Sequence, residues 1–202
     1  MIDPRQMPPT EQSTVYVVDD DRDLGAAVAR LLGRHGHDAE PFLDPALLLD
    51  MYAQAPAHCV ITDVMMGDMD GFAFADRLRM LDPGVSIVFM TAWPTTANAV
   101  DSVRRYGGLD YLEKPLDEDR LLSAVREGVA WSHHQRRLLA RTAALTPRQR
   151  QVFELLVKGH NSKAIASTLS RSQKSVEDHR AAIAAKTGTN GIAQLIALAG
   201  AT

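Results

Sequence analysis

The sequence lacks cysteine pairs, long apolar runs and, near its C-terminal end, acidic residues. Cys59 is the only cysteine among 202 residues, so an internal disulfide is excluded and a reducing compartment is indicated. No apolar stretch reaches the roughly 18 to 20 residues that a membrane helix needs, and residues 1–13 contain no signal-peptide core. We therefore expect a cytoplasmic protein without a membrane partner, beginning with a disordered segment over 1–13.

Acidic residues are scarce only in the last third of the chain. Residues 131–202 contain 11 Lys and Arg but 3 Asp and Glu, a net charge of +8, whereas residues 1–130 contain 11 and 22, a net charge of -11. A cationic segment suits a polyanionic partner, and an anionic one does not. Because the chain is long enough to bury two small cores, the split predicts two domains with different partners.

Apolar patterning divides the anionic part into alternating strands and helices. Short buried-strand patterns occupy 15–18, 59–62, 86–90 and 109–112, and the segments between them show helical apolar spacing. Counting one strand before each expected helix, we read the alternation as five strands and five helices. This predicts an α/β domain with a doubly wound five-stranded parallel sheet. The helices are expected near 24–32, 45–51, 72–81, 95–105 and 118–133.

The cationic part reads as a set of short helices. Thr146 is a typical N-cap with Pro147 at the first helical position, and Gly159 is a typical stop. Further helices are expected over 162–169, 174–186 and 190–199, and two of them are joined by a tight turn in the proportions of a helix-turn-helix. The predicted organisation is a domain over 14–130, a helical linker over 131–144 and a small all-α domain over 145–202.

Charged and hydroxyl side chains follow the strand patterns at their carboxyl ends. Asp19 and Asp20 follow the first, Asp63 another, Thr91 ends a third and Lys114 follows the last. In a parallel sheet these ends share one crevice, where clustered carboxylates repel one another unless a cation is present. A few oxygen ligands suit Mg²⁺, and the pattern predicts phosphoryl chemistry with Asp63 as the nucleophile.

Four segments of the anionic part together resemble bacterial response-regulator receiver domains, whose sheet is flavodoxin-like. The resemblance covers roughly 14–130. It implies that Asp63 is the phosphoacceptor, and that Mg²⁺ is held by Asp19, Asp20, Asp63 and the backbone carbonyl of Met65. The segments are Val-Val-Asp-Asp-Asp (17–21), Thr-Asp-Val-Met-Met (62–66), Phe-Met-Thr-Ala (89–92) and Glu-Lys-Pro-Leu (113–116).

The same resemblance assigns a switch. Thr91 and Lys114 would sense the phosphoryl group, and Tyr111 would swing inward on activation. The sequence departs from the family pattern at Gly67, where proline is usual, and at Trp93, which is followed by proline beside the switch threonine.

The cationic domain resembles the LuxR-type DNA-binding domain over 145–199. The motifs are Leu-Thr-Pro-Arg (145–148), Ser-Lys-Ala-Ile-Ala (162–166) and Ser-Gln-Lys-Ser-Val-Glu-Asp-His-Arg (172–180). The resemblance implies that Val176 and Ile183 are core residues; Gln149 and Thr187 depart from the usual glutamate and leucine. The expected DNA contacts, to bases or to phosphates, are Lys163, Lys174, Ser175, Glu177, Asp178, His179, Arg180, Ala181 and Lys186.

Together the two domains resemble a FixJ/NarL-type response regulator. That implies phosphorylation of Asp63 by a sensor histidine kinase, formation of a homodimer and binding to double-stranded promoter DNA, with no independent enzyme activity. Two alternatives stay open: a constitutive DNA-binding transcription factor with a vestigial receiver, and a Mg²⁺-dependent phosphohydrolase. A basic bundle that only docks on the acidic domain, and a calcium loop at 68–71, are weaker interpretations.

Overall fold

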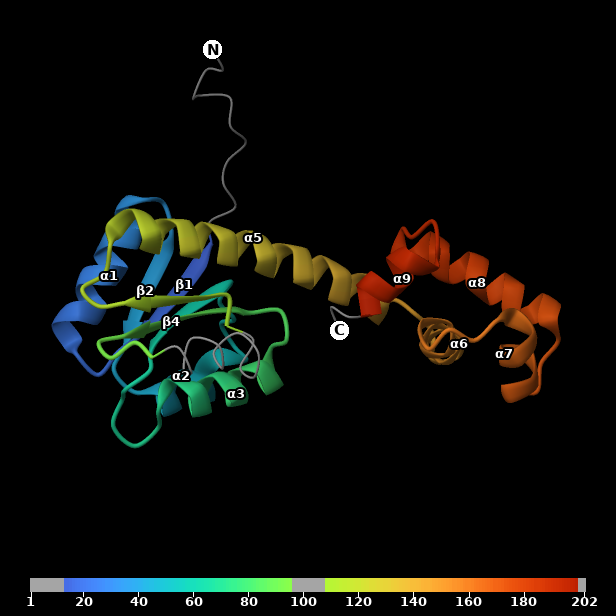
Figure 1. Ribbon diagram of the computed structural model, residues 1–202, viewed down its shortest axis with the longest axis horizontal. Helices are drawn as coiled ribbons and strands as arrows, with labels where there is room; N and C mark the ends of the chain where they lie inside the picture. Colours follow the sequence, from blue (N-terminus) through green and yellow to red (C-terminus); the bar gives the residue numbers. More distant parts are fainter. Residues whose placement is uncertain (1–12, 96–107, 200–202) are drawn as a thin grey trace, which may run out of the picture. The chain divides into compact units, whose positions relative to one another are not determined.

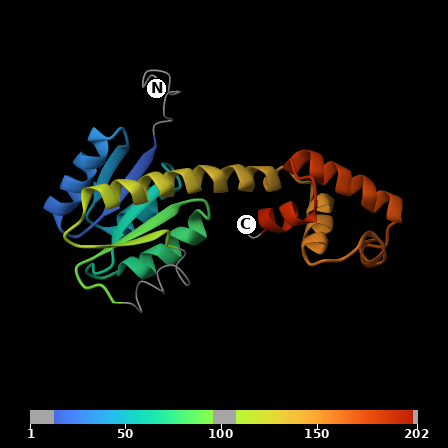
Figure 2. The same ribbon diagram turned by 45° about the horizontal axis from the view of Figure 1, so that its top comes forward.

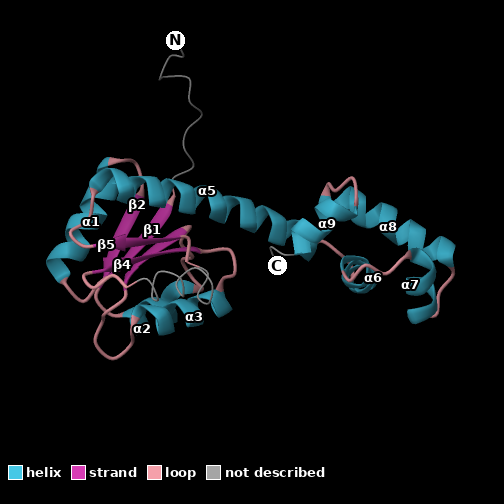
Figure 3. Cartoon of the chain, in the orientation of Figure 1, coloured by secondary structure: helices cyan, strands magenta, loops and turns pink. Residues whose placement is uncertain are grey.

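The computed structural model describes residues 13–95 and 108–199 and divides the chain into two compact units, 1–133 and 134–202. The first unit is an α/β sandwich and the second consists of helices (Figures 1 and 3). The helix expected over 95–105 lies almost entirely outside the described residues. Among the described residues, no helix is long and apolar enough to cross a membrane.

The first unit is built on a fully parallel sheet of five strands in the order β2-β1-β3-β4-β5. This order confirms the predicted doubly wound sheet. It places β1 and β3 side by side, so the chain reverses its winding direction there and opens a crevice at their carboxyl ends. The strands are β1 (Thr14–Val18), β2 (Asp38–Phe42), β3 (Cys59–Asp63), β4 (Ser86–Thr91) and β5 (Asp110–Glu113).

Helices cover both faces of the sheet and bury two apolar clusters. One face packs Val60, Ile87 and Phe89 against α2 (Pro45–Tyr52) and α3 (Gly71–Leu81). The other packs its strands against α1 (Arg22–Arg34) and α5 (Glu118–Ala143), as the turned view also shows (Figure 2). Because both faces are covered, β3 and β4 are buried at every position, which is why they read as continuous apolar runs in the sequence.

Strand β2 departs from that pattern. Its residues Asp-Ala-Glu-Pro-Phe are mostly exposed or half-buried, and it carries Pro41 within the strand. As the edge strand of the sheet it has one free side, where a missing backbone N–H removes no ladder hydrogen bond. Its sequence therefore shows no strand pattern.

Helix α5 is a single helix from Glu118 to Ala143. The sequence predicted a helix to about His133 followed by a helical linker, and the two are continuous in the structure because no glycine or proline falls between 129 and 143 to interrupt them. Gly128 lets α5 approach the sheet closely, because a Cβ there would lie 2.6 Å from the Ser86 hydroxyl and 3.2 Å from the Cys59 sulfur. Cys59 is fully buried at this contact, and burial raises the pKa of its thiol to about 12.

The second unit packs four helices around an apolar core. Thr146 and Gln149 form a capping box at the start of α6, and the turn after α6 contains Gly159 at a φ of 83°, as the cap signals predicted. Asn161, rather than Ser162, caps α7. The helices are α6 (Pro147–Val157), α7 (Ser162–Thr168), α8 (Gln173–Thr187) and α9 (Ile192–Ala199).

Candidate functional site

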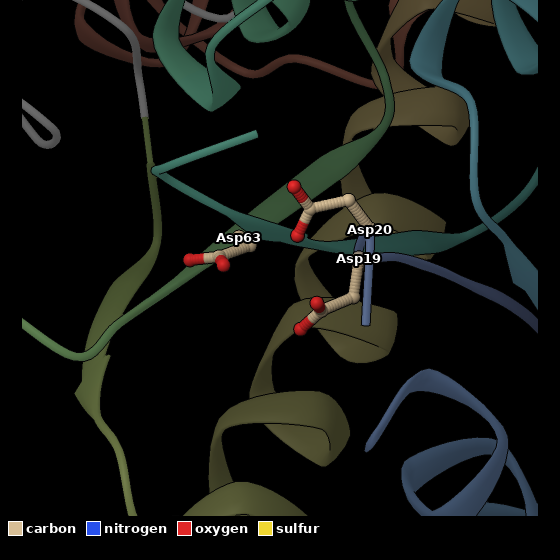
Figure 4. Close-up of side chains that lie close together, drawn as sticks. All are labelled: Asp19, Asp20 and Asp63. Atoms are coloured by element: carbon tan, nitrogen blue, oxygen red, sulfur yellow. The ribbon is translucent and has the colours of Figure 1, made fainter. Parts of the chain in front are cut away.

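Three carboxylates lie together at the carboxyl ends of β1 and β3. The register that pairs Val18 with Thr62 brings the following residues, Asp19 and Asp63, next to each other. One carboxylate oxygen from each of Asp19, Asp20 and Asp63 lies within 4.8 Å of the other two, and the three side chains are close together in Figure 4. Asp19 and Asp63 are 1% and 6% exposed, whereas Asp20 is exposed. Two of the three negative charges are therefore held away from bulk water.

Lys114 bridges the two buried carboxylates. Its Nζ lies 2.8 Å from Asp19 Oδ2 and 2.8 Å from Asp63 Oδ2. Burial lowers the pKa of Lys114, but the hydrogen bonds and charges of the two aspartates outweigh it and raise the pKa above 10.5. Lys114 precedes Pro115 across a cis peptide bond. One ammonium against three carboxylates leaves two negative charges uncompensated.

That donor set fits a magnesium ion. The side-chain ligand atoms are all carboxylate oxygens, which Mg²⁺ prefers, and Mg²⁺ commonly takes only a few protein ligands and keeps several waters. The uncompensated charge matches that of a divalent cation, and the exposed carboxylate of Asp20 leaves an open side toward solvent. Within the described residues, this is the one group of three or more metal-ligating side chains that the chain brings together.

Backbone groups hold the buried carboxylates in place. The Asp21 N–H donates to Asp19 Oδ1 at 2.9 Å, and the Met65 N–H lies 3.4 Å from Asp63 Oδ1. Each carboxylate thus has one oxygen fixed by the loop that follows its strand and the other on Lys114. Met65 is 64% exposed, and its backbone N–H is the group that lies beside Asp63.

The two remaining residues that the sequence predicted to act in a switch, Thr91 and Tyr111, lie on the neighbouring strands β4 and β5. Thr91 is buried at the end of β4, where its Oγ1 accepts a hydrogen bond from the Trp93 N–H at 3.1 Å, and its carbonyl accepts one from the Lys114 N–H at 2.7 Å. Tyr111 packs against the cluster under α2 and α3, and its hydroxyl is buried without a hydrogen-bond partner among the described residues. Trp93, beside them, is 76% exposed.

One residue important to this site was missed by sequence reasoning. Gly71, the first residue of α3, lies so close to β3 that a Cβ there would be 2.2 Å from the Asp63 carbonyl oxygen. Its N–H donates to the Val64 carbonyl at 3.0 Å. Asp70 caps α3 immediately before it, so the Asp-Gly pair at a helix start was the available signal. The absence of a side chain at Gly71 thus lets the start of α3 lie against the backbone of Asp63.

In the second unit, α8 presents most of the predicted DNA contacts to solvent. Val176 and Ile183 are buried, which confirms their predicted place in the core. Thr187 is also buried; its hydroxyl donates to the Ile183 carbonyl at 2.7 Å and lies 2.9 Å from the Thr189 hydroxyl, so the polar residue is satisfied inside the helix packing. The exposed predicted contacts are Lys163, Lys174, Glu177, Asp178, Ala181 and Lys186, and those partly exposed are Ser175, His179 and Arg180.

Two of the cations expected to bind phosphates already have partners within the unit. The Lys186 ammonium donates to the Ala144 carbonyl at 3.0 Å and to Gln149 Oε1 at 2.9 Å. The Arg180 guanidinium donates to the Ser162 hydroxyl at 2.6 Å and lies 3.4 Å from a Glu177 oxygen. These bonds connect α8 to α6 and α7, a structural use that the sequence pattern did not indicate.

Comparisons with known proteins agree with this arrangement. Residues 15–126 match the response regulator receiver domain, and residues 143–199 match the bacterial regulatory proteins of the luxR family. The transcriptional regulatory protein FixJ of Bradyrhizobium diazoefficiens is 30% identical over 94% of this chain and 96% of its own length. The tetrathionate response regulatory protein TtrR of Salmonella typhimurium is 29% identical over 91% of this chain and 90% of its own.

Solved structures lead to the same group. Full-length FixJ from B. japonicum aligns with a TM-score of 0.54 at 31% identity, covering 95% of this chain and 98% of that one. The response regulator StyR aligns with a TM-score of 0.53 at 28% identity, covering 95% of this chain and all of the other. The similarity thus spans both units.

Proposed function

The chain belongs to the two-component response regulators that join a receiver domain to a LuxR-type DNA-binding domain, which are phosphoacceptor transcription factors rather than enzymes, and we propose that phosphorylation of Asp63 controls its binding to promoter DNA. The proposed domains are a receiver over 14–130, a helical linker over 131–144 and a DNA-binding domain over 145–202. A sensor histidine kinase is the proposed donor, and the cytoplasm the proposed compartment.

The observation that carries this proposal is the contact of Asp63 with Lys114 beside two further carboxylates. A carboxylate oxygen of Asp63 attacks the phosphorus of a phosphohistidine on the kinase; the O–P bond forms as the P–N bond breaks, and the imidazole leaves with its electron pair and takes up a proton. Asp19, Asp20, Asp63 and the Met65 carbonyl would hold Mg²⁺. When bound, the ion neutralises charge on the phosphoryl oxygens.

Phosphorylation changes the charges that Lys114 and Thr91 face. The phosphoryl group carries about -1.5 to -2 charge but replaces the single negative charge of the Asp63 carboxylate, so the site gains at most about one further negative charge, together with three acceptor oxygens. Lys114 already reaches Asp63, and the Thr91 hydroxyl lies at the end of the next strand, so both can turn toward the new oxygens. Tyr111 lies on β5, the strand next to the one that ends in Thr91. Its hydroxyl lacks a hydrogen-bond partner among the described residues. Movement of these side chains would favour a dimer-competent surface.

Dimerisation would couple the two units functionally. Two copies of α8 would then reach half-sites about 34 Å apart on one face of a duplex. Neither half-site alone needs high affinity, because the second contact becomes intramolecular once the first is made. Phosphorylation at Asp63 would thereby raise promoter occupancy without any change in the DNA-binding unit itself.

The test uses acetyl phosphate and Mg²⁺ on the full chain and on Asp63→Asn. We expect the wild type to gain about 80 Da, one phosphoryl group, to shift toward a dimer on size exclusion and to enrich duplexes from a random library more strongly. Asp63→Asn should show none of these changes, whereas Asp68→Asn, an exposed aspartate in the following loop, should behave as the wild type. Absence of the adduct on the peptide containing Asp63 would refute the phosphoacceptor assignment.

The same measurements separate the alternatives. Enrichment that is equal with and without phosphoryl donor would indicate a constitutive DNA-binding protein. Repeated turnover of small phosphate esters that Asp63→Asn abolishes would indicate a phosphohydrolase.

A further inference from the structure

The part of α8 that can enter a major groove lies opposite its buried side. An α-helix turns about 100° per residue, so the face opposite Val176, Ile183 and Thr187, all buried, is centred on a strip of four residues. All four are exposed. The strip consists of Lys174, Asp178, Ala181 and Ala185.

The four side chains of this strip differ in their ability to form hydrogen bonds. Ala181 and Ala185 have short side chains that let the helix approach base edges but form no hydrogen bonds. Lys174 lies one turn before Asp178, and its long, flexible side chain can reach a phosphate and offset the repulsion between the Asp178 carboxylate and the DNA backbone. Asp178 is therefore the hydrogen-bonding group at the centre of the strip.

The neighbouring carboxylate is already engaged. Glu177 lies on the flank of α8, and its Oε1 is 3.4 Å from Arg180 Nη1. Arg180 in turn donates to the buried Ser162 at the start of α7 at 2.6 Å. Among the described residues, Asp178 has no ion-pair partner. Asp178 therefore lies on the outward strip without an ion-pair partner among the described residues, whereas the adjacent Glu177 is paired with Arg180 on the flank of α8.

We propose that Asp178 reads a cytosine in each half-site by accepting a hydrogen bond from its N4 amino group. This inference rests on the proposed function of α8 in DNA binding. In the major groove, guanine and thymine present acceptors, which repel a carboxylate. Adenine presents its N6 donor beside the N7 acceptor, whereas cytosine presents a donor alone. A carboxylate that only accepts therefore favours a C·G pair at the position it faces.

The experiment selects duplexes from a random library with the acetyl-phosphate-treated full chain, followed by sequencing. We expect the wild-type motif to contain one strongly preferred cytosine per half-site. Asp178→Ala should relax that position about tenfold and leave the other positions unchanged. Asp178→Asn should shift the preference from cytosine to adenine, because an amide can pair with N6 and N7 together.

Glu154→Ala is the control, since it removes an exposed carboxylate of α6 that is not among the predicted DNA contacts. It should leave the selected motif unchanged. The assignment is overturned if Asp178→Ala selects the wild-type motif, if Asp178→Asn keeps the cytosine, or if Glu177→Ala, which removes the adjacent carboxylate, relaxes the cytosine position instead. Circular dichroism and phosphoryl uptake at Asp63 confirm that each variant is folded. If the wild type enriches no motif at all, DNA reading itself fails; if it enriches one that the Asp178 variants leave unchanged, only the cytosine assignment fails.

Discussion

The acidic pocket of the first unit and the outward strip of α8 are built in opposite ways. The pocket collects side chains that are up to 95 residues apart, as between Asp19 and Lys114, and buries them at the ends of parallel strands. The strip is a single helical face whose side chains point into solvent. The pocket depends on side chains from distant parts of the chain that meet and are partly buried. The strip depends on side chains that remain exposed because the opposite face of α8 is packed.

Charge behaves differently in the two places as a result. Lys114 is 15% exposed and contacts carboxylates that are 0% and 9% exposed at their side chains, so each charge there depends on its partner. Beside the strip, the side chains of the Arg180–Glu177 pair are 41% and 51% exposed, so water and salt screen their attraction. Substitutions in the pocket should therefore affect folding and phosphoryl transfer together, and substitutions on the strip should affect DNA binding alone.

The largest effect is expected from Lys114→Ala. Removing the ammonium leaves two nearly buried carboxylates facing each other, which should lower the free energy of unfolding of the first unit by about 3 kcal/mol. Urea titration followed by tryptophan fluorescence measures this unit selectively, because Trp93 and Trp131 both lie within 1–133. Mg²⁺ should restore part of the loss.

The pH dependence gives a second check on that variant. The pKa of Lys114 is raised in the folded protein, so its stabilisation is present below the unfolded value of 10.5 and is lost as the pH rises through the folded value. Wild type and Lys114→Ala should therefore converge in stability at strongly alkaline pH. Arg120→Ala, which removes an exposed pair with Asp110, should leave the urea midpoint unchanged. Equal midpoints for Lys114→Ala and wild type at neutral pH would contradict this account.

Gly71→Ala tests whether close backbone approach supports the pocket. The new Cβ meets the Asp63 carbonyl, a backbone atom that cannot move without displacing β3, so we expect a loss of about 2 kcal/mol and slower phosphoryl uptake at Asp63. Gly67→Ala, in the same loop, would place its methyl group with no heavy atom within 4 Å and should match the wild type. If the two variants take up phosphoryl equally fast, Gly71 does not position Asp63.

Lys174→Ala should have the smallest effect and should act only on DNA binding. If Lys174 neutralises one phosphate, its loss should weaken binding to all sequences alike and reduce the slope of log affinity against log salt by about one. Lys186→Ala serves as the contrast, because its ammonium is bonded to Ala144 and Gln149; it should lower the melting temperature of the second unit and leave the salt slope unchanged. Unchanged slopes for both variants would show that neither lysine contacts phosphate.

Sequence reasoning succeeded where one structural demand dominates a segment. The strands buried on both faces had to be apolar throughout, so β1, β3 and β4 were recognisable, as was the cap at Thr146. It failed where neighbours decide the outcome. Strand β2 has no apolar pattern because it lies at the sheet edge.

The sequence by itself determined which side chains follow which strands, and therefore that carboxylates, a hydroxyl and an ammonium would meet at one edge of a parallel sheet. Only the tertiary structure decided how these groups pair: Lys114 shared by Asp19 and Asp63, Gly71 against the Asp63 carbonyl, and Arg180 turned toward α7 while Asp178 stays exposed. Apolar patterns along the sequence indicate which residues are buried, because burial is a property of each single residue. Hydrogen bonds and close contacts depend on distances between residues far apart in the chain, and these exist only once the chain has folded.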